Sequence, residues 1–224
     1  MNHSADKSDS TRVLLVDDDP FTLTVVAAML RGLGCDVVSE ETSAAGGLQA
    51  AQRLEPDAAV LDLDLGEGPT GIDVAQRLRA MLPDIGIVVL STYEEPRLMG
   101  YNQPPLPEGS IYLVKRTVTD PGILERAIAV SLDPEARAIA LPVSGAHVAS
   151  KMTDLQIDLM RMVAIGHSNA EIARLRSLTV PSAEKAIARL IKQLGLQATP
   201  AQNQRVLIAQ MYYQLTGAVS TRRA

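Results

Sequence analysis

Several short apolar runs in the chain end on residues that can do chemistry. Asp17 and Asp18 follow the run VLLV, Asp62 follows AAVL, Ser91 follows GIVVL, and Lys115 follows IYLV. In an open parallel sheet, ligands bind beyond the carboxyl ends of the strands, so these side chains are predicted to meet at one edge. Three carboxylates at one place repel one another, and a hard divalent cation with oxygen ligands would neutralise them. The pattern therefore indicates a Mg²⁺ site.

The chemistry that this set of residues supports is phosphoryl transfer. A metal-bound carboxylate can attack phosphorus, while the metal, an ammonium group and a hydroxyl neutralise the transferred oxygens. We predict Asp62 as the nucleophile, with Lys115 and Ser91 beside it, because its strand is central. Each residue alone has a simpler role: an aspartate at a strand end often caps the next helix, as expected for Asp19 before Pro20, and a lone lysine is usually solvated. Because these residues follow four separate strands in the order that such a site requires, we favour a phosphoryl-transfer site over these simpler roles.

The elements that position these residues alternate along the chain. Strands are predicted at 13–16, 37–38, 58–63, 86–90 and 111–114, and helices near 20–32, 43–54, 71–81 and 121–131. Continuous apolar strands separated by helices imply an α/β fold with a doubly wound, five-stranded parallel sheet covered on both faces. Segment 94–110 has four prolines and two glycines, which permit at most a short helix.

The chain beyond residue 150 has a different composition. Residues 1–149 carry 11 basic and 22 acidic side chains, whereas residues 150–224 carry 10 basic and 4 acidic ones. Helices are predicted at about 153–165, 168–176, 180–194 and 202–216, with no strand among them. A basic helical part joined to an acidic domain is expected where only the second part approaches a polyanion such as DNA.

The segments VLLVDDDP, VLDLDLGEGPTGIDVAQRLR, VVLST and YLVKRTV resemble the receiver domain of bacterial two-component response regulators, over roughly Arg12 to Leu132. The resemblance implies the strand order 2-1-3-4-5, Mg²⁺ as cofactor and a histidine kinase as the phosphoryl donor. It also implies a role for each matching residue: metal ligands Asp17, Asp18, Asp62 and the backbone carbonyl of Asp64; phosphoacceptor Asp62; phosphate-binding Lys115; and switch residues Ser91 and Tyr112. The chain departs from the family at Gly66, where proline is usual, and at Arg116, where proline or a small residue is usual.

The segment GHSNAEIA and the closing QLGL resemble the small all-α helix-turn-helix domain of LuxR-type regulators, the NarL/FixJ family. Ser168 is predicted to begin a helix with Glu171 in a capping box. In a recognition helix from Val180 to Leu194, an apolar stripe faces the core: Ala183, Ile187, Leu190 and Leu194. By resemblance, base contacts are assigned to Glu184, Lys185 and Ala188, and phosphate contacts to Ser182, Arg189 and Lys192. The alternative is that these charges only solvate a surface helix.

The last predicted helix is more apolar than a small domain needs. In the LuxR-type family this helix pairs two domains, so Val206, Ala209 and Met211 are candidates for a homodimer contact that forms on phosphorylation. Packing into the core of the domain explains the same residues equally well.

These patterns give a domain plan and exclude several classes of protein. We predict disordered tails at 1–11 and 218–224, a receiver at 12–132, a linker at 133–150 and the helix-turn-helix domain at 151–217. The single cysteine, Cys35, excludes an internal disulfide, and the three isolated histidines indicate no zinc site. No apolar run is long enough to span a membrane, and the polar start lacks the apolar core of a signal peptide, so we expect a cytoplasmic location.

Together, the patterns predict a response regulator transcription factor, with no enzymatic activity beyond self-phosphorylation and self-dephosphorylation of Asp62. Two alternatives stay open. A regulator could bind DNA independently of phosphorylation and use its receiver only for dimerisation, or the acidic cluster could belong to a phosphatase or phosphotransferase. The second alternative leaves the basic helical part unexplained.

Overall fold

The computed structural model of the chain describes residues 10–100, 103–139, 151–196 and 202–217. It divides into two compact units. The sheet unit comprises Met1–Ser91 with Pro104–Val143, and the helical unit comprises Thr92–Gln103 with Ser144–Ala224. The sequence pattern assigned the receiver to one continuous stretch, 12–132, and the structure differs because Thr92–Gln103 packs with the C-terminal helices. Most of the predicted tails lies outside the described residues.

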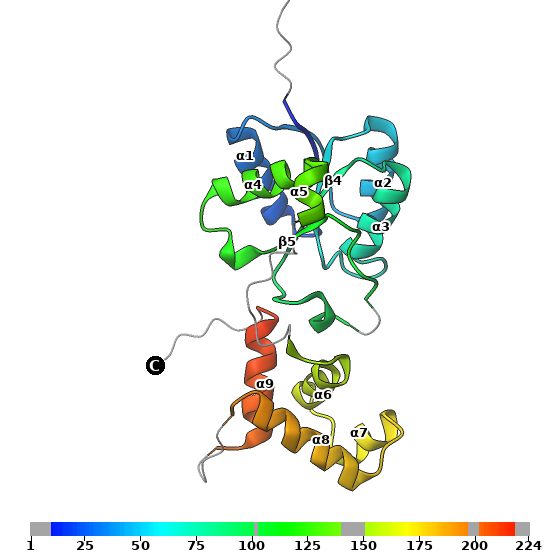
Figure 1. The fold of residues 1–224 in the computed structure, drawn as a ribbon, viewed down its shortest axis with the longest axis vertical. Coiled ribbons are helices and arrows are strands. Elements are labelled where there is room, and N and C mark those ends of the chain that lie inside the picture. Colours follow the sequence, from blue (N-terminus) through cyan, green and yellow to red (C-terminus); the bar gives the residue numbers. More distant parts are fainter. Residues whose placement is uncertain (1–9, 101–102, 140–150, 197–201, 218–224) are drawn as a thin grey trace, which may run out of the picture. The chain divides into compact units, whose positions relative to one another are not determined.

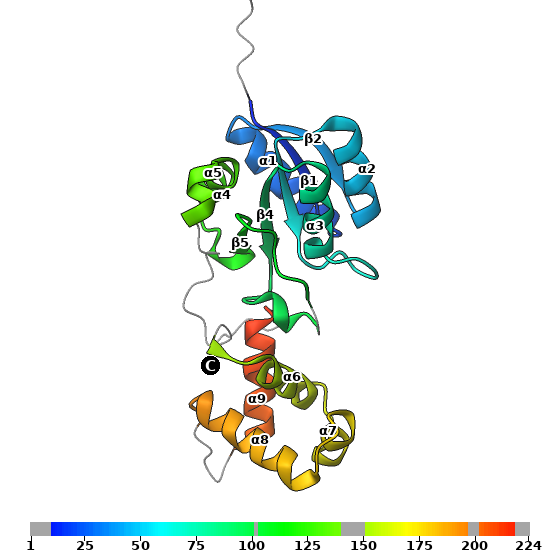
Figure 2. The same cartoon turned by 45° about the vertical axis from the view of Figure 1, so that its right-hand side comes forward.

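The sheet unit has the predicted five parallel strands in the order β2-β1-β3-β4-β5. The strands are β1 (Arg12–Val16), β2 (Asp36–Glu41), β3 (Ala58–Asp62), β4 (Gly86–Ser91) and β5 (Ile111–Val114). The helices between and after them are α1 (Pro20–Gly32), α2 (Ala44–Leu54), α3 (Gly71–Met81) and α4 (Pro121–Leu132). Figures 1 and 2 show this alternation of strand and helix. The doubly wound α/β fold is confirmed.

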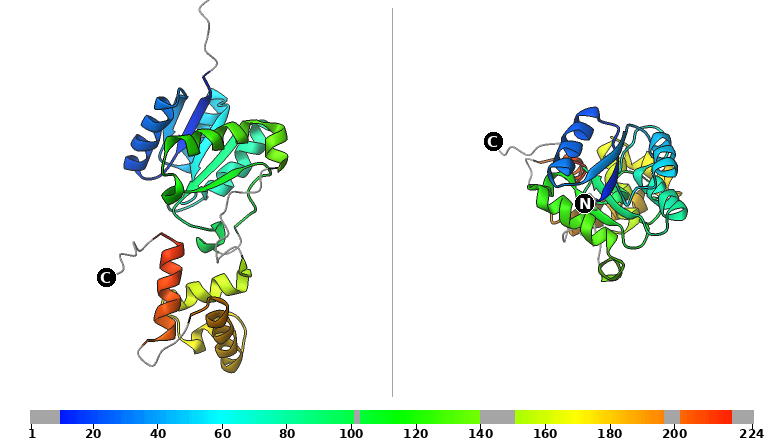
Figure 3. Two further views of the ribbon diagram at one scale, coloured as in Figure 1. Left: turned by 60° about the vertical axis from the view of Figure 1, so that its left-hand side comes forward. Right: turned by 90° about the horizontal axis from the view of Figure 1, so that it is seen from above.

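Helices cover both faces of the sheet, which is why its central strands are apolar on both sides. Helices α1 and α4 lie over one face, as the left view of Figure 3 shows, and form a core with alternate strand residues such as Val13, Leu15 and Val88. Helices α2 and α3 cover the other face. Every residue of β3 is buried, so Asp62 lies at the end of a fully enclosed strand.

Helix caps fix the loops at the carboxyl edge of the sheet. The Asp19 carboxylate accepts hydrogen bonds from the backbone N–H groups of Phe21 and Thr22, and Pro20 is the first residue of α1, as predicted. Thr70 and Asp73 form a reciprocal capping box at α3. These caps hold the β1–α1 and β3–α3 loops in place beside the candidate site.

In its described residues, the connection from β4 to β5 contains only the short 3₁₀ helix η1 (Pro96–Leu98), in agreement with its prolines. A second 3₁₀ turn, η2 (Lys115–Thr117), follows β5. One expectation is corrected: the predicted linker 133–150 begins with helix α5 (Pro134–Ile139). The Asp133 carboxylate accepts from the N–H groups of Glu135 and Ala136, so an aspartate cap before proline starts a helix there. Residues 140–150 lie outside the described part.

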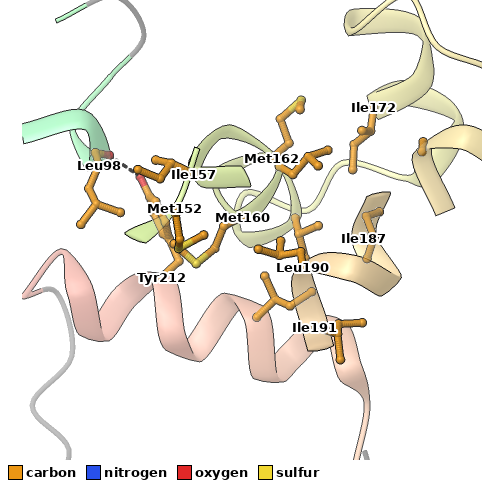
Figure 4. Packing of buried hydrophobic residues seen from close by; sticks show 14 of the residues in the cluster. Leu98, Met152, Ile157, Met160, Met162, Ile172, Ile187, Leu190, Ile191 and Tyr212 are labelled. Atoms are coloured by element: carbon orange, nitrogen blue, oxygen red, sulfur yellow. Dashed lines mark hydrogen bonds between the residues drawn. The ribbon is translucent and has the colours of Figure 1, made fainter. Parts of the chain in front are cut away.

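The helical unit contains α6 (Asp154–Ala164), α7 (Asn169–Leu175), α8 (Val180–Gln193) and α9 (Gln204–Leu215), close to the predicted bounds. Their apolar faces meet in one core, part of which Figure 4 shows around Met160, Leu190 and Tyr212. Ser168 caps α7 by accepting from the N–H of Glu171 at 3.2 Å. The reciprocal half of the predicted capping box is absent because the Glu171 carboxylate instead pairs with Arg174 at 2.6 Å.

A buried ion cluster adds to this core. Asp158 of α6 is only 1% exposed and lies 3.2 Å from a guanidinium nitrogen of Arg176 and 3.5 Å from one of Arg161. Burial raises the pKa of Asp158, and the charges of the two arginines oppose that rise. A buried carboxylate without such partners would destabilise the fold, so Asp158 needs both arginines. Because Arg176 directly follows α7, its ion pair with Asp158 links α6 to the end of α7.

The start of α3 supplies the first prediction. A Cβ on Gly71 would lie 1.9 Å from the backbone oxygen of Asp62, so Gly71→Ala must displace α3 or the end of β3. We expect a loss of about 3 kcal/mol in unfolding free energy, the upper part of the range for overpacking. Gly32→Ala is the matched control, because a Cβ there meets nothing within 4 Å. Equal midpoints for the two variants in urea unfolding would contradict the prediction.

Candidate phosphoryl-transfer site

Three carboxylates gather at the carboxyl edge of the sheet. Asp17 and Asp18 follow β1, and Asp62 ends β3, the neighbouring strand. Each carboxylate offers an oxygen within 4.8 Å of the oxygens offered by the other two. Asp17 and Asp62 are buried, whereas Asp18 is exposed. The set can hold one hard cation such as Mg²⁺ and leave an open side for a further ligand.

Lys115 directly follows β5 and contacts the carboxylates from the carboxyl end of that strand. Its Nζ donates to Asp17 Oδ2 at 2.8 Å and lies 3.0 Å from Asp62 Oδ1. Only 23% of the lysine side chain is exposed, so its charge acts on the carboxylates with little screening by water. The structure therefore brings together Asp17, Asp62 and Lys115, which are far apart in sequence, as predicted.

Burial and like charge shift the titration of the cluster. Desolvation raises the pKa of Asp62 to about 6, against the opposing charge of Lys115. Desolvation, followed by the charges of Asp17 and Asp64, also raises the pKa of Asp18. Burial alone would lower the pKa of Lys115, yet the hydrogen bond to Asp17 and the charge of Asp62 raise it. The site thus favours a cation beyond the one that Lys115 supplies.

The loop after β3 folds back onto the acceptor. The N–H of Asp64 donates to Asp62 Oδ2 at 3.1 Å, and the N–H of Gly66 donates to Asp64 Oδ1 at 3.3 Å. Gly66 has φ of +78°, which proline cannot adopt. This backbone explains why glycine replaces the proline that is usual in receivers. The role of the Asp64 carbonyl as a metal ligand stays a prediction.

The two predicted switch residues are both fully enclosed. Ser91 ends β4 with 0% exposure, and Tyr112 lies in β5 with 1% exposure. Ser91 pairs in register with Val114, the residue before Lys115. The hydroxyl and the ammonium group therefore end neighbouring strands at the same edge. Their switch role is not tested by this arrangement.

Helix α8 presents the predicted DNA-contact residues to the outside of the helical unit. All six are exposed: Ser182, Glu184, Lys185, Ala188, Arg189 and Lys192. The opposite stripe is buried through Ala183, Ile187 and Leu190 as predicted, with Ile191 in place of Leu194, which is only partly buried. Thr179 caps the helix by accepting from the N–H of Ser182 at 3.3 Å. The helix is therefore amphipathic with a charged outer face.

Helix α9 divides its apolar residues between two uses. Ile208, Tyr212 and Leu215 are buried in the core of the helical unit, and Met211 packs against that core. Val206 is 52% exposed and Ala209 is partly buried. Core packing accounts for most of the apolar character of this helix, and Val206 is the predicted dimer residue with the most free surface.

The sequence pattern did not single out the residues that join segment 92–103 to the helical unit. Leu98 is fully buried in the core cluster of that unit, and Arg97 contacts Met152 and Asp154. An isolated leucine between prolines carries no periodicity, so no local signal marks it as a core residue.

Comparison with known proteins agrees with this geometry. Residues 13–101 match the family of response regulator receiver domains. The matched residues include Asp17, Asp18 and Asp62. The chain carries a receiver domain of the response regulator type. The match ends at residue 101, inside the proline-rich connection after β4, where the chain departs from the usual fourth helix of a receiver.

Two relatives are similar to the chain over both of its units. VraR of Staphylococcus saprophyticus is 22% identical over 197 residues, which cover 83% of the chain and 91% of VraR. The DNA-binding transcriptional activator DevR/DosR of Mycobacterium tuberculosis is 29% identical over 205 residues, which cover 83% of the chain and 89% of the activator.

Solved structures show the same two-domain fold. Two RcsB dimers bound to two parallel DNAs give a TM-score of 0.56 at 17% identity, over 93% of the chain and 100% of RcsB. RcsB from Salmonella enterica serovar Typhimurium, bound to promoter rprA in the presence of phosphomimetic BeF₃⁻, gives 0.53 at 16% identity, over 91% of the chain and 98% of RcsB. None of the helices that the structure describes has the length and apolar character needed to cross a bilayer.

The raised pKa of Asp62 supplies the second prediction. Between about pH 4 and pH 6 the unfolded chain has lost the Asp62 proton while the folded chain retains it, so ionisation costs stability as the pH rises. In Mg²⁺-free buffer, Asp62→Asn removes this cost and should stabilise the sheet unit by about 2–3 kcal/mol above pH 6, with a gain that shrinks toward pH 4.

The measurement is chemical unfolding over that pH range. Asp36→Asn is the control, because Asp36 is exposed at the opposite end of the sheet and should show no such pH-dependent gain. A pH-independent effect of Asp62→Asn would show that burial does not penalise this carboxylate.

Proposed function

We propose that the protein is a transcription factor whose DNA binding is controlled by phosphorylation of Asp62. The observation that supports this most directly is the contact of Lys115 with both Asp17 and Asp62, within a chain that also carries a basic helix-turn-helix unit. A carboxylate nucleophile, two further acidic ligands and a fixed ammonium group form a site for phosphoryl transfer.

The reaction that fits these residues is transfer from a phosphohistidine of a sensor histidine kinase. An Asp62 oxygen forms the new bond to phosphorus, the P–N bond breaks, and the imidazole leaves with the bonding electron pair and takes up a proton. With a pKa of about 6, Asp62 is mostly ionised at neutral pH and can act as the nucleophile. We assign the stabilisation of the transferred oxygens to Lys115 and the Ser91 hydroxyl, and the second switch position to Tyr112.

The proposed cofactor is Mg²⁺, held by Asp17, Asp18, Asp62 and the backbone carbonyl of Asp64. The hard carboxylate oxygens, clustered within 4.8 Å, suit this ion in donor type and in number. When bound, Mg²⁺ supplies positive charge that balances the cluster and the transferred phosphoryl oxygens. Lys115 contacts Asp17 and Asp62 of the same cluster and supplies a second positive charge.

The DNA partner is proposed from α8 and from the relatives. The exposed face of α8 carries Lys185, Arg189 and Lys192, and residues 150–224 have six more basic than acidic side chains. DevR/DosR is a DNA-binding transcriptional activator, and RcsB is solved on DNA. We assign base-edge contacts to Glu184, Lys185 and Ala188, and phosphate contacts to Ser182, Arg189 and Lys192.

We further propose that the phosphorylated chain forms a homodimer through α9, with Val206, Ala209 and Met211 at the contact. RcsB is solved as dimers on DNA, and Val206 leaves an apolar side chain exposed on α9. A cytoplasmic location suits a protein that receives phosphate from a kinase and binds DNA. No enzymatic activity is proposed beyond self-phosphorylation and self-dephosphorylation of Asp62.

Phosphorylation supplies the third prediction. Incubation with acetyl phosphate and Mg²⁺ should add the mass of one phosphoryl group to the wild type and none to Asp62→Ala, and should raise DNA affinity only in the wild type. Asp36→Ala, which changes an exposed carboxylate remote from the cluster, should behave as the wild type. An equal DNA affinity with and without phosphorylation would favour a phosphorylation-independent regulator. Turnover of a free phosphoester would favour a phosphatase.

The two classes of contact on α8 supply the fourth prediction. Arg189→Ala should weaken binding to all DNA sequences and lower the slope of log affinity against log salt by about 1, because one phosphate contact is lost. Lys185→Ala should instead cost about 1–3 kcal/mol on the preferred operator and relax the preference at one base pair. Gel shifts over a salt series and an operator library separate the two, and identical profiles would refute the assignment.

A further inference from the structure

The residues that directly follow the hydroxyl of the proposed site belong to the helical unit. We call Thr92–Gly100 the anchor segment; it is part of the compact unit formed by α6 to α9. Leu98 of this segment has 0% exposure and is a member of the core of that unit, and Tyr93 packs against the same core. Figure 4 shows Leu98 near Met152, Ile157 and Tyr212.

Polar contacts tie the anchor segment to helix α9. The hydroxyl of Tyr212 donates to the backbone oxygen of Leu98 at 3.0 Å, and this buried bond is drawn in Figure 4. The N–H of Glu94 donates to the backbone oxygen of Leu215 at 2.9 Å, in the last turn of α9. Both bonds are between the anchor segment and α9, so the segment holds the C-terminal half of that helix.

A second set of contacts ties the segment to helix α6. One guanidinium nitrogen of Arg97 donates to the backbone oxygen of Met152 at 2.9 Å and to Asp154 at 2.8 Å. In return, Arg161 of α6 donates to the backbone oxygen of Arg97 at 3.0 Å. The anchor segment therefore closes the helical core between its first and last helices.

We propose that the anchor segment is the element through which phosphorylation of Asp62 acts on the helical unit. This inference rests on the function proposed above. Ser91 ends β4, and only Thr92 and Tyr93 separate it from Glu94, which is already bonded to α9. A movement of Ser91 toward a phosphoryl group would pull the chain at Thr92 and Tyr93. This pull would weaken the hydrogen bonds between the anchor segment and helices α6 and α9. The state of the acceptor thereby biases the packing of α6 and α9.

Hydrogen exchange on the full-length chain tests this coupling. With acetyl phosphate and Mg²⁺, protection of the amides in the anchor segment and in α9 should fall about fivefold, since a typical hydrogen bond has about that weight in an equilibrium. Tyr212→Phe keeps the buried ring but removes its bond to Leu98. In that variant protection should already be low without phosphorylation, and phosphorylation should change it less than about twofold.

Tyr213→Phe is the matched control, because the neighbouring hydroxyl donates to Ala164 of α6 and not to the anchor segment. It should respond as the wild type, and Arg97→Gln should respond as Tyr212→Phe. Protection in the wild type that stays unchanged or rises, or a Tyr212→Phe response equal to that of the wild type, would overturn the proposal. A wild type that gains no phosphoryl mass or does not bind DNA would instead overturn the function proposed above, so the two failures are distinct.

Discussion

The sheet unit is organised around a balance of charge at one edge. A parallel sheet brings the ends of β1, β3 and β5 together, and here those ends carry two buried carboxylates and one ammonium group. Lys115 alone cannot neutralise Asp17, Asp18 and Asp62, and burial of Asp62, with a smaller contribution from the charge of Asp17, raises its pKa to about 6. The remaining negative charge makes this edge of the sheet compatible with a bound cation. The caps at Asp19 and Thr70 and the close approach of Gly71 to the Asp62 carbonyl hold the loops around it.

Much of the sheet unit could be predicted from the sequence, because its order follows from local patterns. Apolar runs place the strands, and each chemically active residue lies one or two positions beyond a run, so the topology alone brings Asp17, Asp62 and Lys115 together. The charged face of α8 follows in the same way from its helical period. Helix α5 was missed although its signal, Asp133 before Pro134, is present, because the prolines and glycine of the surrounding stretch are typical of a linker.

The rest depends on contacts between distant parts of the chain. Nothing near Leu98 indicates that its partners are Met152 and Tyr212, since a single apolar residue has no period. The missing half of the Ser168 capping box is a similar case: Glu171 had two partners within reach, and the ion pair with Arg174 displaced the cap. An aspartate in a helix is usually exposed, so the sequence alone does not indicate that Asp158 is buried. Its burial depends on the ion pairs with Arg161 and Arg176. Choices between competing partners are set by tertiary structure.

The insertion of Leu98 into the helical core also bears on how such proteins can diversify. Receiver and output domains that meet only through a linker can recombine as independent modules, because each carries its own complete core. Here the core of the helical unit is completed by residues encoded between two strands of the sheet unit. A chimera joined within 140–150 would combine this chain's helices with a foreign β4–β5 connection and leave a void where Leu98 lies. The two parts of this chain are therefore expected to have changed together, with the connection after β4 inherited as part of the output domain.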